Sequence, residues 1–219
     1  MFVASGDHGA YDCWSFDPTD HRVSVDFPSA SPWTVSVGGT ALSVRTDGTY
    51  LSEAGWEEYL TTSGTGGGLN PTEARPTWQV GPGVNNDKSD GKRQSPDVAA
   101  PASDESAYQI FVTNKGEAQG DWRHVGGTSA AAPFWAGTML LVQQLAQASG
   151  VGKLGYVNPM LYAIANSSAT ANAFHDVTRG GNLFYPATQG WDYATGLGSP
   201  DVAVLANAIV NYLAAHPGT

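Results

Sequence analysis

The chain has 219 residues, of which 41% are hydrophobic and 14% charged, and 20 acidic against 10 basic residues give a net charge of −10. This length suits one α/β domain or two small ones. The excess of acidic over basic residues argues against nucleic acid as a partner, since phosphate binding needs clustered Lys and Arg. A protein that works in acid tolerates such a charge, because partial protonation of its carboxylates relieves self-repulsion. No run of 18 apolar residues is present, so we expect neither a transmembrane span nor a membrane partner.

Short strands separated by turns are predicted for the first half of the chain, because Gly and Pro are frequent and apolar runs are brief. Residues 1–7 lack the basic region and the long apolar run of a signal peptide and are typical of a buried strand that ends in a turn. Residues 63–68 form a Gly-rich loop, but no Gly-Lys-Ser/Thr follows, which excludes a phosphate-binding loop. Further strands are expected at residues 23–27, 34–37 (ended by Gly38 and Gly39), 97–100 and 108–113, with a turn-rich surface segment at 81–92.

Three helices are predicted in the second half, where apolar residues recur at helical spacing. They cover residues 134–148, 160–165 after a start at Asn158-Pro159, and 201–215 with Ser199 or Asp201 as the N-cap. We find no internal repeat and no charge run. The economical interpretation is therefore a single α/β domain over residues 1–219.

Residues 127–133 (GTSAAAP) place a serine at the start of a buried helix. Pro133 fits a first helical turn, where its missing N–H costs nothing. The unpaired N–H groups and partial positive charge of a helix N-terminus can activate a hydroxyl and stabilise an anion beside it. Ser129 is therefore either a helix N-cap or a nucleophile, and this segment alone favours the cap.

Asp176 and Asp192 lie in two Gly-rich, loop-forming segments near the end of the chain. Carboxylates combined with backbone carbonyls suit Ca²⁺, which takes six to eight oxygen ligands in a flexible geometry. The alternative is two turn-forming aspartates. A cysteine-based zinc cluster and an intrachain disulfide are both excluded, because Cys13 is the single cysteine.

A Ser–His–Asp triad would require a histidine beside Ser129. His8 follows Asp7, but neighbouring residues on a strand or turn diverge, so these two are not expected to act as partners. His175, beside Asp176, is either a metal ligand or a surface residue. The histidines therefore offer no convincing general base.

Glu53, Glu57 and Glu58 have helical spacing, which favours a solvated helix face over a general base. Five tryptophans are expected to lie in the core or to line a cleft. They are Trp56, Trp78, Trp122, Trp135 and Trp191.

A series of stretches runs nearly from end to end in a recognisable order: residues 5–9 (SGDHG), 25–32 (VDFPSASP), 37–40 (VGGT), 66–68 (GGG), 96–100 (PDVAA), 127–133 (GTSAAAP), 174–180 (FHDVTRG) and 190–200 (GWDYATGLGSP). In this order they resemble the sedolisin family of serine-carboxyl peptidases, relatives of subtilisin that work in acid. The ordered set is far more specific than any one stretch. It favours the nucleophile over the helix cap at Ser129.

The resemblance implies an α/β, subtilisin-like fold with a mostly parallel sheet flanked by helices, truncated at its N-terminal side. Ser129 would be the nucleophile and Asp7 the carboxyl group that stabilises the oxyanion. In the family, Glu replaces His as the base, because an imidazole is protonated in acid. That Glu and its Asp partner precede the segment that begins here at Ser5, so the chain would lack the base and match the C-terminal portion of the catalytic domain.

The resemblance also implies one structural calcium ion. Asp176 and Asp192 match the family's carboxylate ligands, and the carbonyls of Val177, Thr188 and Gly190 would complete much of the shell. The sequence departs from the family's usual Gly-Pro pair at Thr188 and Gln189.

The expected function is hydrolysis of peptides or proteins at acidic pH in a secreted, extracellular setting, by an endopeptidase or a tripeptidyl-peptidase. Activity should fall as the pH rises, because an oxyanion-stabilising Asp must be protonated to donate a hydrogen bond. The first alternative is a non-catalytic fragment, or a subunit that needs a partner chain, an N-terminal segment or a propeptide. The second is an ordinary subtilase that uses His, which an Asp rather than an Asn at position 7 disfavours.

Overall fold

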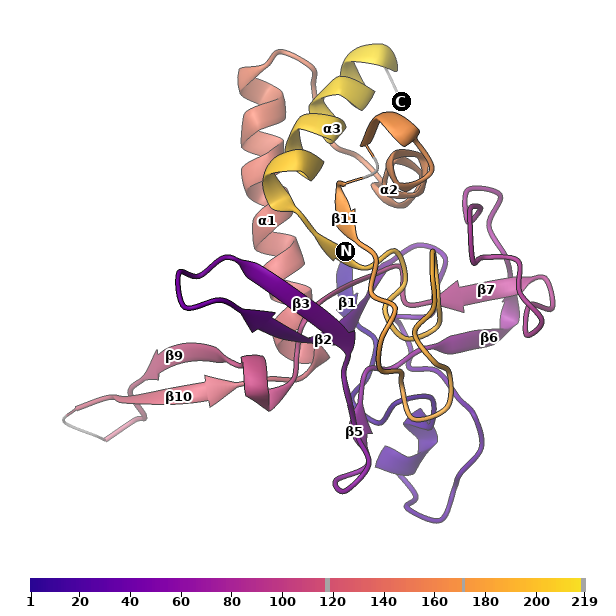
Figure 1. Cartoon of the computed structure of the whole chain (residues 1–219), viewed down its shortest axis with the longest axis vertical. Helices are drawn as coiled ribbons and strands as arrows, with labels where there is room; N and C mark the ends of the chain where they lie inside the picture. The colour runs from indigo at the N-terminus through magenta and orange to yellow at the C-terminus, as the bar shows by residue number, and fades with distance from the viewer. Residues whose placement is uncertain (117–118, 171, 218–219) are drawn as a thin grey trace.

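The computed structural model describes residues 1–116, 119–170 and 172–217. Its helices are α1 (Thr128–Ala148), α2 (Asn158–Ala165) and α3 (Val202–Ala215), with 3-10 turns η1 (Asp12–Ser15), η2 (Asp104–Ser106) and η3 (Ser168–Thr170). Its strands are β1 (Phe2–Ala4), β2 (Val35–Val44), β3 (Tyr50–Gly55), β4 (Glu57–Glu58), β5 (Ser63–Gly64), β6 (Gly68–Ala74), β7 (Lys92–Ser95), β8 (Val98–Pro101), β9 (Tyr108–Val112), β10 (Asp121–Val125), β11 (Phe174–His175) and β12 (Ser199–Pro200). The three α-helices gather on one side of the molecule, above the strands in Figure 1.

The central sheet is built around β2. Its first residues pair in parallel with β1, its middle pairs in parallel with β8, and its far end pairs antiparallel with β3. Parallel neighbours require crossover connections, which the long excursion between β2 and β8 supplies. The prediction of an α/β fold with a mostly parallel sheet flanked by helices is confirmed.

The hydrophobic core lies between this sheet and the helices. Val35, Val37 and Val98 of the sheet face Trp135 of α1, and Leu205 of α3 closes the same cluster. Trp135 is fully buried, and its indole N–H donates a 2.8 Å hydrogen bond to the carbonyl of Ala99. Burial of a large ring with its N–H satisfied fixes the position of α1 against β8.

The prediction that Gly38 and Gly39 end a strand is wrong, since β2 continues to Val44. These glycines serve close packing. A Cβ on Gly38 would lie 2.8 Å from the ring of Pro96, and one on Gly39 would lie 2.6 Å from Cβ of Ala102. Residues 63–68, predicted as a loop, likewise contain β5 and the start of β6.

Residues 23–27 do not form the predicted strand; Ser24 makes an isolated bridge with Tyr11 and a turn follows. Val23 and Phe27 are exposed, so their alternation does not face the core. An apolar–polar pattern predicts a strand only where one face is buried, and this segment lies at the surface.

The three predicted helices are confirmed, with α1 beginning earlier than expected, at Thr128 rather than residue 134. Pro133 therefore lies inside it, near the N-terminus. Asp201 caps α3, since its Oδ1 accepts a 3.0 Å hydrogen bond from the N–H of Val204. The side chain of Ser199 turns away to Glu53.

Glu53, Glu57 and Glu58 do not form the predicted solvated helix face. Glu53 lies in β3 and the other two form β4. Glu53 is buried, accepts hydrogen bonds from the hydroxyls of Thr40 and Ser199, and has its pKa raised by burial. Pairing of β3 with β2 and of β4 with β5 overrides the helical spacing of these residues.

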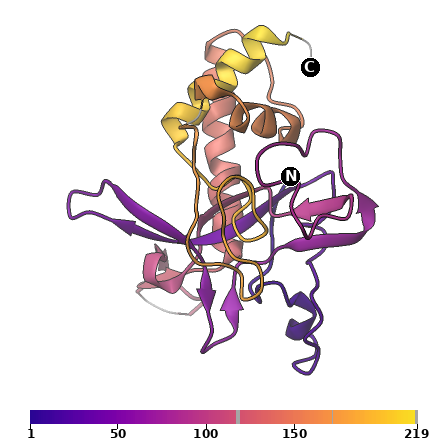
Figure 2. The same cartoon turned by 45° about the vertical axis from the view of Figure 1, so that its right-hand side comes forward.

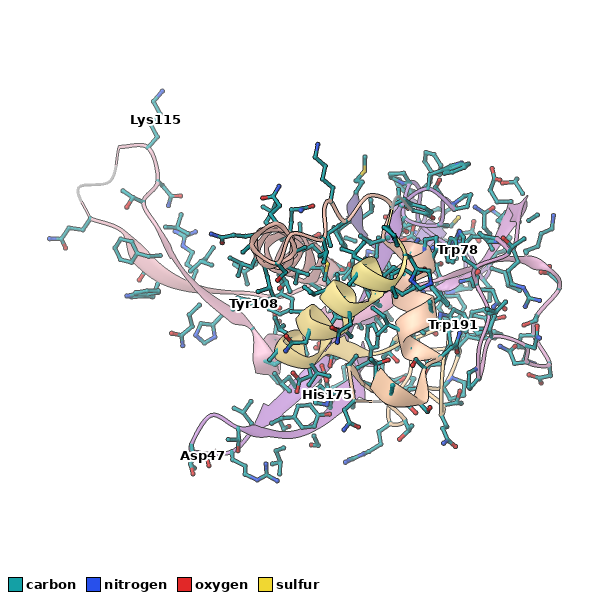
Figure 3. All side chains as sticks on the ribbon, turned by 90° about the horizontal axis from the view of Figure 1, so that it is seen from above. Asp47, Trp78, Tyr108, Lys115, His175 and Trp191 are labelled. Atoms are coloured by element: carbon teal, nitrogen blue, oxygen red, sulfur yellow. The ribbon has the colours of Figure 1, made fainter. Side chains whose placement is uncertain are left out.

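Two hairpins project from the body. The β2–β3 hairpin carries Asp47 at its tip, and the β9–β10 hairpin carries Lys115 (Figures 1 and 3). Trp122 of β10 is 65% exposed and packs edge-on against Phe111, so its prediction as a core or cleft-lining residue is wrong.

A second buried cluster lies at the opposite end, where Trp78 and Trp191 are seen in Figure 3. It adjoins a buried ion pair in which the Arg93 guanidinium lies 2.6 Å from the Asp97 carboxylate, both side chains being fully inaccessible. Among the described residues, no helix is long and apolar enough to cross a membrane.

Candidate active site

Asp7 is bonded to the N-terminus of α1. Its Oδ1 accepts a 2.8 Å hydrogen bond from the backbone N–H of Thr128 and lies 2.7 Å from that residue's hydroxyl. The same hydroxyl accepts a 3.2 Å hydrogen bond from the N–H of Gly6. The segment that follows β1 is thereby fixed to the start of α1, although more than a hundred residues separate them in the sequence.

Gly127 is the N-cap residue of α1, so the helix-cap interpretation of Ser129 is wrong. Gly127 has a φ of +81°, and a Cβ there would lie 2.8 Å from Oδ2 of Asp7. Glycine meets both demands, since it tolerates positive φ and leaves room for the carboxyl group. Ser129 is the second residue of the helix, and its side chain does not cap the helix.

Ser129 and Asp7 line one cavity of about 260 Å³. Ser129 is exposed, and within the described part of the chain no side chain forms a hydrogen bond with its hydroxyl. His8 lines the same cavity, but its ring packs against Trp14 at 5.1 Å between centroids, and its Nδ1 is buried without a partner. The structure thus brings the predicted nucleophile and oxyanion group together, and none of the described side chains is hydrogen-bonded to the nucleophile as a general base.

Two further carboxylates line this cavity that the sequence did not single out, Asp12 and Asp26. Burial and, after it, the nearby negative charge of Asp26 together raise the pKa of Asp12 to about 6. Burial also raises the pKa of Asp26. Asp26 belongs to the stretch 25–32 that helped to carry the family resemblance, but neither residue was assigned a role from the sequence. The fold of the surface segment after β1 brings both of them to the cavity of Asp7.

Asp176 and Asp192 both reach the turn at residues 188–190. The carboxylate of Asp176 accepts hydrogen bonds of 3.0 and 3.1 Å from the N–H of Gly190, and Oδ2 of Asp192 accepts one of 2.9 Å from Thr188. Val177, next to Asp176, is buried. All five predicted calcium ligands therefore belong to one loop region between β11 and β12, which winds beside the strands in Figure 2.

Burial raises the pKa of Asp192 to about 6, partly offset by N–H groups that donate to its carboxylate, those of Thr188, Thr195 and Ala194. Over the described ranges, no three His, Cys, Asp or Glu side chains gather as a metal site. A site here would therefore depend on two carboxylates and backbone carbonyls.

Comparison with known proteins decides the family. A sequence profile of the subtilase family matches residues 2–192. The chain belongs to the subtilase family. The solved structure of Pseudomonas sedolisin, a serine-carboxyl proteinase complexed with two molecules of pseudo-iodotyrostatin, superposes with a TM-score of 0.79 at 31% identity. That match covers 98% of this chain and 55% of the solved one, and it confirms the subtilisin-like fold.

Curated relatives confirm the resemblance to sedolisins within this subtilase group. Sedolisin of Pseudomonas sp. (strain 101) is 35% identical over 213 residues, which cover 93% of this chain and 33% of that protein. Kumamolisin of Bacillus sp. (strain MN-32) is 35% identical over 91% of this chain and 34% of its own length. Tripeptidyl-peptidase sed1 of Aspergillus fumigatus is 31% identical over 94% and 34%. The chain therefore spans about a third of the length of these relatives.

Proposed function

We propose that the protein acts as a serine-carboxyl peptidase in acid, with Ser129 as nucleophile and Asp7 as oxyanion stabiliser. The observation that carries this proposal is the shared cavity, in which Ser129 opens toward solvent at the N-terminus of α1 beside a carboxyl group held by Thr128. A developing negative charge there meets the positive end of the helix dipole and a hydrogen-bond donor.

In the proposed reaction, Oγ of Ser129 attacks the peptide carbonyl and loses its proton to a carboxylate base. The tetrahedral oxyanion is stabilised by the protonated carboxyl group of Asp7, which donates a hydrogen bond only in its neutral form. The C–N bond then breaks, the base returns its proton to the leaving amine, and water hydrolyses the acyl-enzyme. A carboxylate base suits acid, where an imidazole of ordinary pKa, about 6.5, is protonated.

The base would come from a segment outside the described residues, since none of these contacts the hydroxyl of Ser129. The chain alone would then be inactive or nearly so, and a partner segment or propeptide would complete it. The setting would be acidic and extracellular. Endopeptidase and tripeptidyl-peptidase specificity stay as alternatives, and one of the relatives above is named a tripeptidyl-peptidase.

The test is hydrolysis of denatured protein at acidic pH by the chain alone and mixed with the N-terminal half of a sedolisin catalytic domain. We expect activity in the mixture only, with Asp7→Ala lowering kcat about 10²–10³-fold, as loss of one oxyanion donor does. Ser129-dependent turnover by the chain alone would refute the missing base. Turnover by neither preparation would refute the peptidase proposal in favour of a non-catalytic fragment.

We propose further that the loop after β11 holds one calcium ion, with carboxylates from Asp176 and Asp192 and carbonyls from Val177, Thr188 and Gly190. The donor set supports it, because Ca²⁺ prefers such oxygens. The buried Asp192 carboxylate also forms no ion pair with a described residue, and a cation would offset its burial. The ion would be structural and would hold this loop against the strands.

Removal of calcium is expected to lower the melting temperature. At an ion concentration of about 100 times Kd, binding adds about 2.7 kcal/mol, which corresponds to roughly 5–10 °C for a chain of this size. The measurement is calorimetry with and without chelator, using Asp192→Asn as the variant and the exposed Asp87→Asn as the matched control. A melting temperature that chelator leaves unchanged in the unsubstituted protein would rule out the ion.

A further inference from the structure

A buried carboxyl group lies outside the cavity of Ser129, and the proposed reaction does not use it. This group belongs to Glu53 of β3, which is 7% exposed. One of its oxygens lies within hydrogen-bond distance of the hydroxyl of Thr40 in β2, and the other lies as close to the hydroxyl of Ser199 in β12. The carboxyl group therefore joins the central sheet to the strand that ends the loop after β11.

The surroundings of Glu53 supply little positive charge to an ionised carboxylate. Glu53 forms no ion pair with a described residue. The titratable side chains that face it are Tyr50 of its own strand, Tyr108 of β9 and His175 of β11. Burial raises the pKa of Tyr50, and it raises the pKa of Tyr108 to about 12, so both phenols stay neutral in acid and at neutral pH. The ring of His175 is stacked on that of Tyr50, with 4.0 Å between the centroids.

The folded chain favours the neutral form of this carboxyl group. Burial raises the pKa of Glu53, and the hydroxyls of Ser199 and Thr40 and the charge of His175 offset only part of the rise. In the neutral form one oxygen accepts a hydrogen bond, and the other carries a proton that a hydroxyl accepts. Ionisation leaves a buried negative charge whose bonded partners are two hydroxyls, which is a costly arrangement.

A path of backbone hydrogen bonds leads from Thr40 to the start of α1. The carbonyl oxygen of Thr40 accepts the N–H of Ala102 at 2.8 Å and that of Ser103 at 3.1 Å. The carbonyl oxygen of Ala102 in turn accepts the N–H of Gly127 at 2.6 Å. Gly127 caps α1 and directly precedes the helical turn that carries the nucleophile. Thr40 thus binds Glu53 through its hydroxyl and this segment through its carbonyl group.

We propose that Glu53 is a positioning residue for the active site: its neutral carboxyl group holds β2, and through β2 the N-terminus of α1, in the arrangement that Ser129 and Asp7 require. When Glu53 loses its proton, the buried charge weakens this contact and the carbonyl group of Thr40 shifts. The fall of activity above acidic pH then has a second origin besides the ionisation of Asp7. The inference rests on the proposed function of Ser129, but the contact itself is measurable without catalysis.

The sign of the pH effect follows from proton linkage. Because the pKa of Glu53 in the folded chain lies above its ordinary value of 4.5, the folded state keeps this proton to a higher pH than the unfolded chain. The stability that Glu53 contributes is full below the ordinary value and is lost as the pH rises through the raised one. Asp12 and Asp192, whose pKa values are also raised, act in the same direction. Each variant is therefore compared with the unsubstituted chain at the same pH.

Glu53→Gln is the decisive variant, since an amide has the shape of the neutral carboxyl group and does not ionise. Its melting temperature should lie close to that of the unsubstituted chain at pH 4 and exceed it at pH 7 by roughly 2–4 °C, a change the size of about one hydrogen bond. The amide NMR signal of Ala102 should shift less between these pH values in the variant. The exposed Glu73→Gln is the matched control and should behave as the unsubstituted chain at both pH values.

Two substitutions of Thr40 test the hydrogen bond itself. Thr40→Val removes the hydroxyl and should enlarge the loss of stability from pH 4 to pH 7, because a charged acceptor loses more than a neutral one. Thr40→Ser keeps the hydroxyl and should match the unsubstituted chain. A Glu53→Gln chain that fails to fold at pH 4, or one whose stability and Ala102 signal change with pH as in the unsubstituted chain, overturns the proposal.

Hydrolysis separates this proposal from that of the reaction. Mixed with the N-terminal half of a sedolisin catalytic domain, Glu53→Gln should keep its activity to a higher pH than the unsubstituted chain does. No hydrolysis by either mixture, together with the expected melting temperatures, would refute the reaction and leave the contact of Glu53 standing. Hydrolysis with equal pH profiles would refute the positioning role alone.

Discussion

Ser129→Ala is expected to abolish acid-dependent peptide hydrolysis by the chain mixed with the N-terminal half of a sedolisin catalytic domain. Loss of a nucleophile removes the covalent route and costs about 10⁶-fold in kcat. Stability should change little, because Ser129 is exposed and the hydrogen bonds at the start of α1 belong to Thr128 and Asp7. Activity and melting temperature are therefore measured on the same preparation.

The matched control for this substitution is Ser149→Ala. Ser149 is the exposed C-cap residue of the same helix, so the change is chemically identical and far from the cavity. Full activity is expected there at every acidic pH. If Ser129→Ala retained more than about a tenth of the activity, covalent catalysis by Ser129 would be wrong, and the residue would return to a structural role.

Asp97→Ala is expected to destabilise the protein by about 3–5 kcal/mol, the cost of leaving a buried charge without its partner. Arg93 and Asp97 are both fully inaccessible, and their side chains lie 2.6 Å apart. Asp97 Oδ2 also accepts the N–H of Ser36 at 2.8 Å, and Oδ1 accepts the hydroxyl of Tyr162 at 3.0 Å. One carboxylate, just before β8, therefore joins β7, β2 and α2.

Chemical denaturation followed by circular dichroism measures this loss. The control is Asp20→Ala, which breaks an exposed pair with Arg22 and should have a much smaller effect. The double variant Arg93→Met with Asp97→Leu should be more stable than Asp97→Ala, because no buried charge is left unpaired. If Asp97→Ala unfolded at the same denaturant concentration as the unsubstituted chain, Arg93 would have to be solvated in the native state.

Local sequence patterns predicted most of the elements that have a clear apolar periodicity or a clear helix-capping residue. The apolar periodicity of residues 134–148 and 201–215 predicted α1 and α3, and Val35-Ser36-Val37 predicted the start of β2. Local patterns failed where contacts with residues distant in the sequence determine the secondary structure. Gly38 and Gly39 look like a strand end, but contacts with Pro96 and Ala102 make them part of the sheet. Such contacts join segments that the local sequence cannot relate.

Part of the candidate site was likewise predictable from the sequence, and part was not. Motif order named Ser129 and Asp7, yet it could not show that Thr128 bonds Asp7 to the helix. Asp12 and Asp26 carry no motif of catalysis and become neighbours of Asp7 only through the fold. Their raised pKa values arise from burial and from the negative charges of neighbouring carboxylates, which are properties of the assembled cavity.

The sequence by itself determined the family, the α/β class and the serine and carboxyl groups of the proposed chemistry, because these depend on residue types in a fixed order. The tertiary structure alone decided that Gly127 caps α1 and leaves the hydroxyl of Ser129 free beside Asp7. It also decided that Asp12 and Asp26 share the cavity of Ser129 and Asp7. The physical reason is that burial and the approach of charges from distant segments arise only when the chain is folded, and these two effects raise the pKa values of Asp12 and Asp26.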